Sequence, residues 1–242
     1  MHITNLRAEQ LGYTVQQIIR LSADGKKVAE TRTILQEVHL PIILNGTQIL
    51  QLVCTPQALP ELILGRLFVE GFLSNPNEII SMTISETEAR VVTQTPSAND
   101  PANDAPLVPF PWKMEWIFTL IHAFQAGAPL YQATHGIHSC FLMHDGRLRA
   151  CFEDLGRHNA MDKAIGYALL QGIPLDESVL FTSGRVPTEI MRKIIRARVP
   201  VLISNAVPTD KAVALARQHH VTLLCTARPE GMDCFSGEDL WT

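Results

Sequence analysis

The chain has 242 residues, of which 46% are hydrophobic and 18% are charged, so it is neither a disordered polypeptide nor a fibrous repeat. Its formal net charge is −4, which argues against a general nucleic-acid binder, because such proteins depend on cationic contacts to phosphate. No apolar stretch approaches the roughly 18 residues needed to cross a bilayer, and the N-terminus lacks the apolar core of a signal peptide, so we expect a cytoplasmic protein outside membranes.

The N-terminal part, residues 1–95, is predicted to form a β-rich domain with one helix. Asn45-Gly46 lies between two runs rich in β-branched residues, which is the strongest short-range sign of a hairpin. Pro60 suits the first turn of a helix and Gly71 suits its end. The elements expected here are strands within 13–54, a helix at 57–73 and two strands within 78–94.

A proline-rich segment follows. Residues 96–111 contain five prolines in sixteen positions and show no periodicity. This composition predicts an exposed loop or linker. Domains average roughly 150 residues, so the chain is long enough for a second domain after this segment, at 112–242.

Helices and strands alternate in this second domain. Strands separated by helices of about ten residues predict βαβ units with right-handed crossovers. Zinc nucleoside deaminases use the same order of elements. We therefore expect the α/β fold class, with a deaminase-like three-layer α/β domain around a mixed, largely parallel sheet and a smaller β-rich N-terminal domain. The expected elements are a helix at 113–126, strands at 137–144 and 147–153, a helix at 159–170, a strand at 178–182, a helix at 187–197, a strand at 200–204, a helix at 209–219 and a strand at 221–225.

The residues that zinc deamination requires are missing. That reaction needs H-x-E followed by P-C-x-x-C, whereas none of the nine histidines is followed two places later by Glu, and no C-x-x-C occurs. We expect no zinc and no other metal site. The cysteines are odd in number and scattered, which argues against a disulfide framework, and Cys234 is expected to be the most exposed of them. The five are Cys54, Cys140, Cys151, Cys225 and Cys234.

Polar residues gather where predicted strands meet predicted helices. The segments 153–166 and 182–190 each follow a strand and open a helix, and such junctions bind anions through free N–H groups and the positive end of the helix. The glycines allow close backbone approach, and the cations add charge. The pair of segments predicts a nucleotide-like or polyphosphate ligand. The residues that carry this interpretation are Gly156, Gly184, Arg157, Lys163 and Arg185.

Plainer alternatives stay open for these segments. Asp154 is a possible helix cap, and Asp162 and Lys163 are possible surface charges. His138 is placed at the same sheet edge by the functional interpretation, whereas the alternative is a turn with one histidine bonded to backbone. The basic run at 192–198 suits a solvated helix end, with a docking patch for an acidic partner as the alternative.

Four motifs together resemble a known family, the formate dehydrogenase accessory proteins or FdhD-type sulfurtransferases. The resemblance spans residues 37–73 and 127–226. The motifs are ATHGIHSC (133–140), EDLGRHNAMDK (153–163), TSGR (182–185) and PVLISNAVPTDKAVALA (200–216). The resemblance implies a deaminase-like fold without zinc, a cytoplasmic location and a homodimer.

The resemblance also implies an activity and a set of ligand contacts. Members of this family receive sulfur from a cysteine desulfurase as a persulfide. They pass it to the molybdenum bis-guanine-dinucleotide cofactor before that cofactor enters formate dehydrogenase. Together with the junctions above, the residues expected to bind the cofactor are Gly136, His138, Gly156, Arg157, His158, Asn159, Asp162, Lys163, Ser183, Gly184, Arg185, Cys225, Thr226, Ala227, Arg228 and Pro229.

The sequence departs from the family at one functional position. The persulfide-carrying cysteines lie in a loop before the helix at 113–126, where this chain has no cysteine. The catalytic residues are therefore unassigned. We keep three hypotheses: an accessory protein that assists sulfuration of the cofactor, a cofactor chaperone without sulfur chemistry, and an enzyme acting on a nucleotide.

Overall fold

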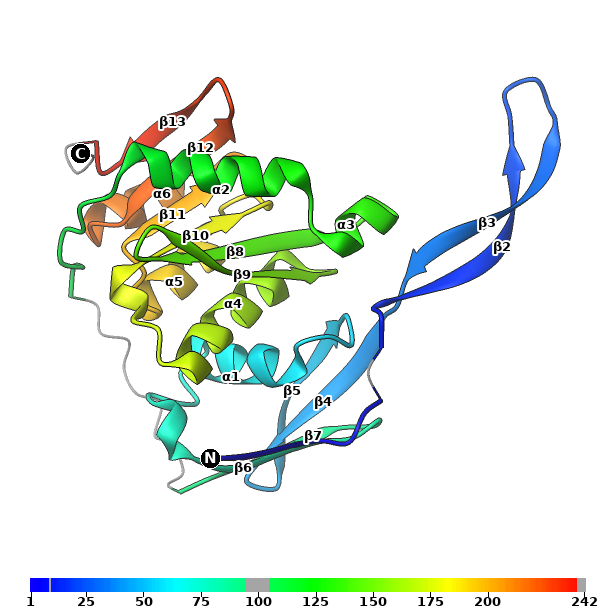
Figure 1. The fold of residues 1–242 in the computed structure, drawn as a ribbon. Helices are drawn as coiled ribbons and strands as arrows, with labels where there is room; N and C mark the ends of the chain where they lie inside the picture. Colours follow the sequence, from blue (N-terminus) through cyan, green and yellow to red (C-terminus); the bar gives the residue numbers. More distant parts are fainter. Residues whose placement is uncertain (9, 95–104, 239–242) are drawn as a thin grey trace.

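The computed structural model describes residues 1–8, 10–94 and 105–238, which form two sheets with helices between them and one projecting arm (Figure 1). Within this part of the chain, no helix is long and apolar enough to cross a membrane.

The N-terminal sheet has five strands in the order β1-β6-β7-β4-β5. The predicted hairpin at Asn45-Gly46 is confirmed, because both residues adopt the positive φ that a tight hairpin turn requires. The helix predicted at 57–73 is present as α1 (Leu59–Val69), which packs on this sheet, whereas β1 was not predicted. The strands are β1 (His2–Asn5), β4 (Val38–Leu44), β5 (Thr47–Cys54), β6 (Ile79–Ile84) and β7 (Ala89–Thr93), with a 3-10 turn η1 (Pro76–Glu78) before β6.

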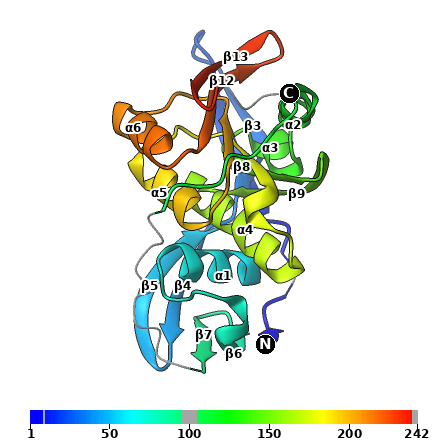
Figure 2. The ribbon, with the colours of Figure 1, turned by 90° about the vertical axis from the view of Figure 1, so that its left-hand side faces the viewer.

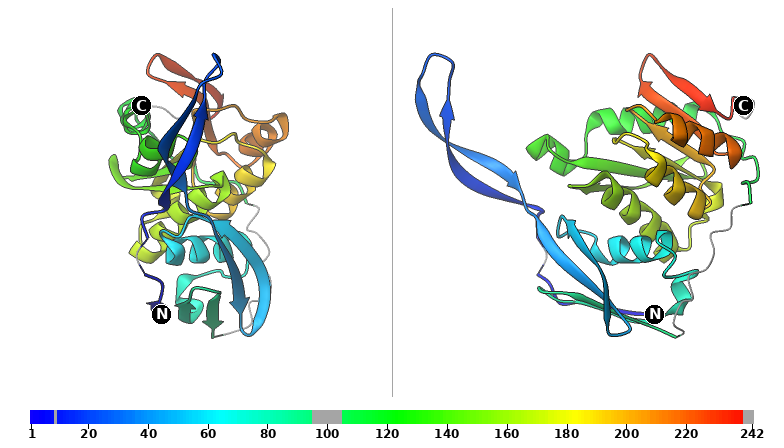
Figure 3. Two further views of the ribbon diagram at one scale, coloured as in Figure 1. Left: turned by 90° about the vertical axis from the view of Figure 1, so that its right-hand side faces the viewer. Right: turned by 180° about the vertical axis from the view of Figure 1, so that it is seen from behind.

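The remaining N-terminal strands form an arm. Strands β2 (Tyr13–Leu21) and β3 (Lys27–Leu35) pair only with each other and project from the body of the molecule (Figures 1 and 3). Their register places Val15, Ile19 and Leu21 on one face, and each of these side chains is at least 60% exposed.

The second sheet is mixed and has six strands in the order β13-β12-β11-β10-β8-β9. Strands β10, β11 and β12 run parallel, and the strands beside them run antiparallel. The predicted strand 178–182 is confirmed at both ends. The strands are β8 (His138–His144), β9 (Arg147–Asp154), β10 (Ser178–Thr182), β11 (Val201–Ser204), β12 (Thr222–Arg228) and β13 (Gly231–Ser236).

Helices cover both faces of this sheet, which confirms the predicted three-layer α/β class (Figure 2). Helix α2 (Met114–Ala126) lies on one face. The other face is covered by α4 (Arg157–Gln171), α5 (Thr188–Arg196) and α6 (Asp210–Gln218). Strand β13, the 3-10 turn η2 (Leu175–Glu177) and the short helix α3 (Pro129–Thr134) were not predicted. Pro129 occupies the first turn of α3, where its fixed φ is favourable.

Residues 96–104 of the predicted loop lie outside the described residues, whereas residues 105–111 follow the surface of the α/β layers. Leu107 is only 3% exposed, and its N–H donates to the carbonyl of His219 at 2.9 Å. The Arg198 guanidinium donates to the carbonyl of Ala105 at 2.6 Å. The expectation of an exposed segment is therefore wrong at Leu107, because its apolar side chain fills the core beneath α4 and α5.

Helices α1 and α4 cross at two glycines. A Cβ atom on Gly65 would lie 1.9 Å from the carbonyl oxygen of Asp162, and one on Gly166 would lie 1.9 Å from that of Glu61. Only glycine allows the two backbones to approach this closely. The contact holds α4, and therefore the loop that precedes it, against the N-terminal part of the chain.

Candidate anion-binding site

The polar strand–helix junctions meet at one edge of the six-stranded sheet. Strand β8 runs antiparallel to β10, with Cys140 opposite Thr182, so the start of β8 lies beside the end of β10. His138 in turn faces Asp154 at the end of β9. Because β10, β11 and β12 are parallel, their carboxyl ends share this edge, which is where open α/β sheets bind ligands.

Four of the predicted site residues are in contact there. His138 Nδ1 lies 3.1 Å from Ser183 Oγ, and the Ser139 N–H donates to the same oxygen at 3.0 Å. A Cβ atom on Gly184 would lie 2.7 Å from the Cβ and Cδ atoms of Arg157, so glycine is needed where the arginine crosses the loop. The sequence therefore correctly predicted that His138, Arg157, Ser183 and Gly184 come together.

The arginines at this edge have no carboxylate partners within the described residues. Arg157 Nε is buried without a hydrogen-bond acceptor, and Arg185 is exposed. Arg228 donates only to two backbone carbonyls, those of Asn205 at 2.6 Å and Ala227 at 2.8 Å. Asn205 Oδ1 is also buried without a donor. Guanidinium groups that lack a counter-charge favour an anion, and phosphate suits their geometry.

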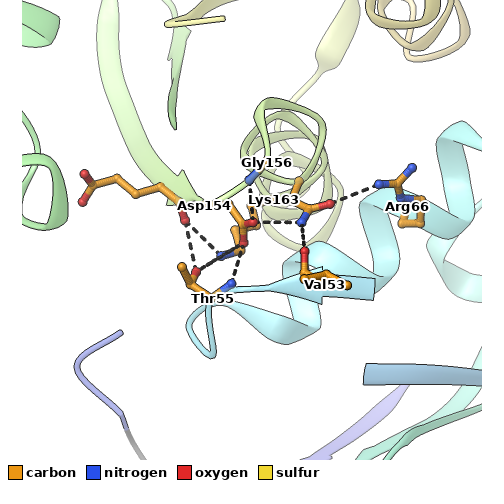
Figure 4. Close-up of polar contacts among 8 residues, drawn as sticks. Val53, Thr55, Arg66, Asp154, Gly156 and Lys163 are labelled. Atoms are coloured by element: carbon orange, nitrogen blue, oxygen red, sulfur yellow. Dashed lines mark hydrogen bonds and ion pairs between the residues drawn. The ribbon is translucent and has the colours of Figure 1, made fainter. Parts of the chain in front are cut away.

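Asp154 holds the loop that leads into α4 (Figure 4). Its Oδ2 lies 2.7 Å from Lys163 Nζ and accepts from the N–H of Thr55 at 3.1 Å and from its hydroxyl at 3.2 Å. Its Oδ1 accepts from the Gly156 N–H at 3.2 Å and from Asn159 Nδ2 at 2.8 Å. The carboxylate is therefore no helix cap; it fixes the Gly156 turn to the end of β5.

Asp162 and Lys163 do not face the edge. Both are fully buried, and Lys163 Nζ also donates to Thr55 Oγ1 at 2.8 Å. Asp162 accepts from Lys193 Nζ at 2.6 Å and lies 2.9 Å from Arg66 Nε. The structure leaves these two side chains no surface for ligand contact, and it also corrects the alternative that they are surface charges. Their partners lie far away in the sequence, so the local pattern held no sign of the pairing.

Asn159 joins the two parts of the chain. Its Nδ2 donates to the Val53 carbonyl at 2.7 Å, and its Oδ1 accepts from Arg66 Nη2 at 3.1 Å. The residue is almost fully buried. It therefore supports the Gly156 turn from beneath, where the sequence had predicted a ligand contact.

His158 lines a pocket of about 720 Å³ between α1, α4 and α5. Burial, followed by the nearby positive charges of Lys193, Arg157 and Arg66, lowers the pKa of His158 to about 4. Burial and then Arg157 also lower the pKa of His138. Both imidazoles are therefore neutral near pH 7, and the cations around them produce a positive potential.

The last predicted segment, 225–229, is only partly available. Cys225 and Ala227 are buried, whereas Thr226 and Pro229 are half-buried and Arg228 is exposed. Gly136 is exposed near the end of β3. Asn205 belongs to the same edge but was not singled out, although its position directly after the predicted strand 200–204 was a usable signal.

None of the five thiols has a lowered pKa. Burial raises the pKa of Cys54, Cys151 and Cys225 to about 12, and raises that of Cys140 well above its usual range. Cys234 is exposed, as predicted, yet partial burial still raises the pKa of its thiol. Thiolate nucleophiles are therefore scarce at neutral pH.

The geometry defines an α/β protein with a candidate anion-binding edge at the ends of parallel strands. The chain matches the FdhD/NarQ family over residues 35–107 and 96–241, and it belongs to that family. It is 27% identical to the "Sulfur carrier protein FdhD" of Bacillus pumilus, over 91% of this chain and 95% of that protein. It is 30% identical to the "Protein FdhD" of Methanocaldococcus jannaschii, over 83% of this chain and 86% of that protein.

A solved structure shares the fold. The crystal structure of a formate dehydrogenase accessory protein from Desulfotalea psychrophila matches with a TM-score of 0.84 and 27% identity. The match covers 95% of this chain and 99% of that one. The family resemblance drawn from the motifs is therefore confirmed.

Proposed function

We propose that this chain is a cytoplasmic accessory protein in formate dehydrogenase maturation. In this proposal it binds the molybdenum bis-guanine-dinucleotide cofactor as cargo and does not carry sulfur on a thiol of its own. The observation that carries the proposal is the combination of unpaired arginines at the sheet edge with five thiols of raised pKa.

The edge suits a ligand with two pyrophosphate groups. Arg157 is the first residue of α4, and Arg185 lies three residues before the first residue of α5, so each arginine is near the N-terminus of a helix. Helix N-termini and guanidinium groups both stabilise phosphate. The unpartnered Arg157 Nε provides a buried donor for a phosphate oxygen. These groups would hold the guanine-dinucleotide ends of the cargo.

The cysteines of this chain are poorly suited to sulfur transfer. A carrier thiol must be exposed and ionised to attack a persulfide donor. No cysteine occurs between Cys54 and Cys140, and both of these are buried. We therefore propose that a cysteine desulfurase delivers sulfur to the bound cofactor by another carrier, or that this protein acts after sulfuration.

The test combines two measurements on the full-length protein. Incubation with a cysteine desulfurase and cysteine, followed by intact-mass spectrometry, is expected to show no added sulfur. Calorimetry with GDP, as a fragment of the cargo, is expected to show binding. A stoichiometric gain of one sulfur that disappears in Cys234→Ala would instead identify Cys234 as the carrier. Absence of GDP binding at millimolar concentration would contradict the cargo assignment.

We also propose that the protein forms a homodimer through the arm. An isolated two-stranded hairpin is at best marginally stable in water, yet this one exposes Val15, Ile19 and Leu21 on one face. The arm, residues 13–35, carries 4 basic and 2 acidic side chains, whereas the whole chain has net charge −4, so arm and body are complementary in charge. Replacing the three residues with Thr should give a monomer in sedimentation experiments, while an unchanged mass would contradict the proposal.

A further inference from the structure

The imidazole of His138 and the hydroxyl of Ser183 form a pair at the edge where β8 begins and β10 ends. His138 Nδ1 lies 3.1 Å from Ser183 Oγ, and this oxygen already accepts the N–H of Ser139 at 3.0 Å. The hydroxyl has a single proton, and Nδ1 is the only acceptor that the described residues offer it. In the free protein the hydroxyl therefore donates to Nδ1, and the neutral imidazole carries its proton on Nε2.

The other ring nitrogen is available to a ligand. His138 Nε2 has no hydrogen-bond partner in the part of the chain that the structure describes, and it is accessible to solvent. Arg157 is close enough for its positive charge to lower the pKa of His138, after the larger effect of burial, and its Nε is buried without an acceptor. The His135 ring, at the end of α3, packs edge-on against Tyr131. A neutral N–H donor and a guanidinium with an unused donor therefore lie near each other, and phosphate oxygens accept from both.

The acidic side chains around His138 are already engaged. Asp154, its partner in the register of β8 and β9, is paired with Lys163 at 2.7 Å. The Glu153 carboxylate accepts from two N–H groups at the start of α3, at 2.9 and 2.7 Å. In the loop after β10 the charged side chain is a further cation, the exposed Arg185. A positive imidazole is therefore disfavoured until a ligand brings negative charge to the edge.

We propose that His138 takes up one proton at Nδ1 when a pyrophosphate group binds at this edge, and that the Ser183 hydroxyl then turns from the imidazole to a phosphate oxygen. The proton comes from solvent. Nδ1–H donates to Ser183 Oγ, which frees the O–H to donate to the ligand, while Nε2–H and Arg157 donate to other phosphate oxygens. The negative charge of the ligand offsets that of Arg157, so the imidazolium becomes stable only in the complex. The inference rests on the proposed function, since the pyrophosphate is that of the guanine-dinucleotide cargo.

The test measures the protons taken up per ligand bound, by calorimetry on the full-length protein in two buffers of different ionisation enthalpy. The probe is GDP-mannose, because its pyrophosphate is a diester and keeps a constant charge between pH 6 and pH 8. The parent should take up a fraction of one proton at pH 6.5, and its affinity should increase by about three- to tenfold from pH 8 to pH 6. His138→Gln should abolish the uptake and the pH dependence. Ser183→Ala should weaken binding more at pH 6 than at pH 8, because the hydroxyl is released only when the imidazole is protonated.

Two further histidine variants show which ring takes up the proton. His158→Gln should retain the uptake, although burial and neighbouring cations, including Arg157, also lower the pKa of His158. The exposed His122→Gln, on α2, is the matched control and should behave as the parent does. Uptake that survives His138→Gln but disappears in His158→Gln would overturn the assignment.

The remaining outcomes separate this inference from the function on which it rests. Binding of GDP-mannose by the parent without proton uptake would overturn the inference while leaving the cargo assignment in place. Equal weakening by Ser183→Ala at pH 6 and pH 8 would overturn the role of the hydroxyl. If the parent binds neither GDP-mannose nor GDP, the cargo assignment fails and the inference fails with it. Thermal melts that match the parent would show that each variant is folded.

Discussion

Lys163 and Asp154 form an ion pair with 2.7 Å between Nζ and Oδ2, and neither side chain has exposed surface. Removing one member of such a pair leaves a buried, uncompensated charge, which costs roughly 3–5 kcal/mol. Lys163→Met should lower the free energy of unfolding by about this amount in urea denaturation, because Asp154 would lose its cation. The Asp154→Asn/Lys163→Met double variant should be less destabilised than the sum of the single ones.

The control for this prediction is an exposed pair. Lys26 and Asp24 are joined at 2.8 Å in the turn of the arm, and both are largely solvated. Lys26→Met should change stability by at most about 1 kcal/mol. If Lys163→Met and Lys26→Met change the free energy of unfolding equally, the buried pair contributes no more to stability than the exposed pair, which contradicts the prediction.

The glycine crossing of α1 and α4 predicts a second stability effect. A methyl group at Gly65 or Gly166 would lie 1.9 Å from a backbone oxygen, so the helices must separate. Gly166→Ala should cost more than about 3 kcal/mol, beyond the usual range for overpacking, and lower the melting temperature accordingly. Gly136→Ala serves as control, since its nearest neighbour would be 3.7 Å away. A melting temperature for Gly166→Ala that equals the control's would contradict the close crossing.

Arg185 is expected to contribute directly to anion binding. It is exposed at the sheet edge and has no carboxylate partner among the described residues. Arg185→Ala should weaken GDP binding by roughly 1.5–3 kcal/mol, as expected for a charge-assisted hydrogen bond. Calorimetry is the measurement, and exposed Arg147, at the other end of β9, provides the control substitution. Equal losses in Arg185→Ala and Arg147→Ala would indicate a general charge effect only.

His158 gives a prediction for pH dependence. Its pKa is lowered to about 4 from 6.5, chiefly by burial. As the pH falls, the unfolded chain binds this proton before the folded protein does, so stability is present above about pH 6.5 and is lost toward pH 4. Between pH 7 and pH 5 the parent should lose about 1–2 kcal/mol more than His158→Gln, after allowance for partial solvation. Urea denaturation at both pH values measures the difference, with the exposed His122→Gln as control.

The α/β alternation was predictable because it is a local signal. Each strand and helix after residue 137 carries its own periodicity, and Asn45-Gly46 defines its hairpin within two residues. The meeting of His138, Arg157 and Ser183 also followed, since β9 and β10 both end at the edge where the antiparallel strand between them, β8, begins. These inferences needed no knowledge of distant contacts.

The buried polar contacts that support the candidate site could not be predicted from local sequence patterns. Asp162 and Lys163 were assigned to the ligand because they are polar and follow Arg157. Their burial depends on Arg66, Lys193 and Thr55, which are separated from them by about thirty residues or more in sequence. Strand β13 carries no distinctive pattern, and its pairing with β12 is irregular. Tertiary contacts, rather than local preferences, decide these features.

The final prediction concerns thiol reactivity. Among the cysteines only Cys234 is exposed, so Ellman's reagent should modify one thiol in the native protein and all five after denaturation. Because the pKa of Cys234 is raised above 9.0, the native rate should be slow at pH 7 and rise about tenfold per pH unit up to pH 9. Cys234→Ala should abolish the native reaction, whereas Cys151→Ala should leave it unchanged. A fast native reaction at pH 7 that survives Cys234→Ala would reveal an activated thiol elsewhere and reopen a sulfur-carrying role for this chain.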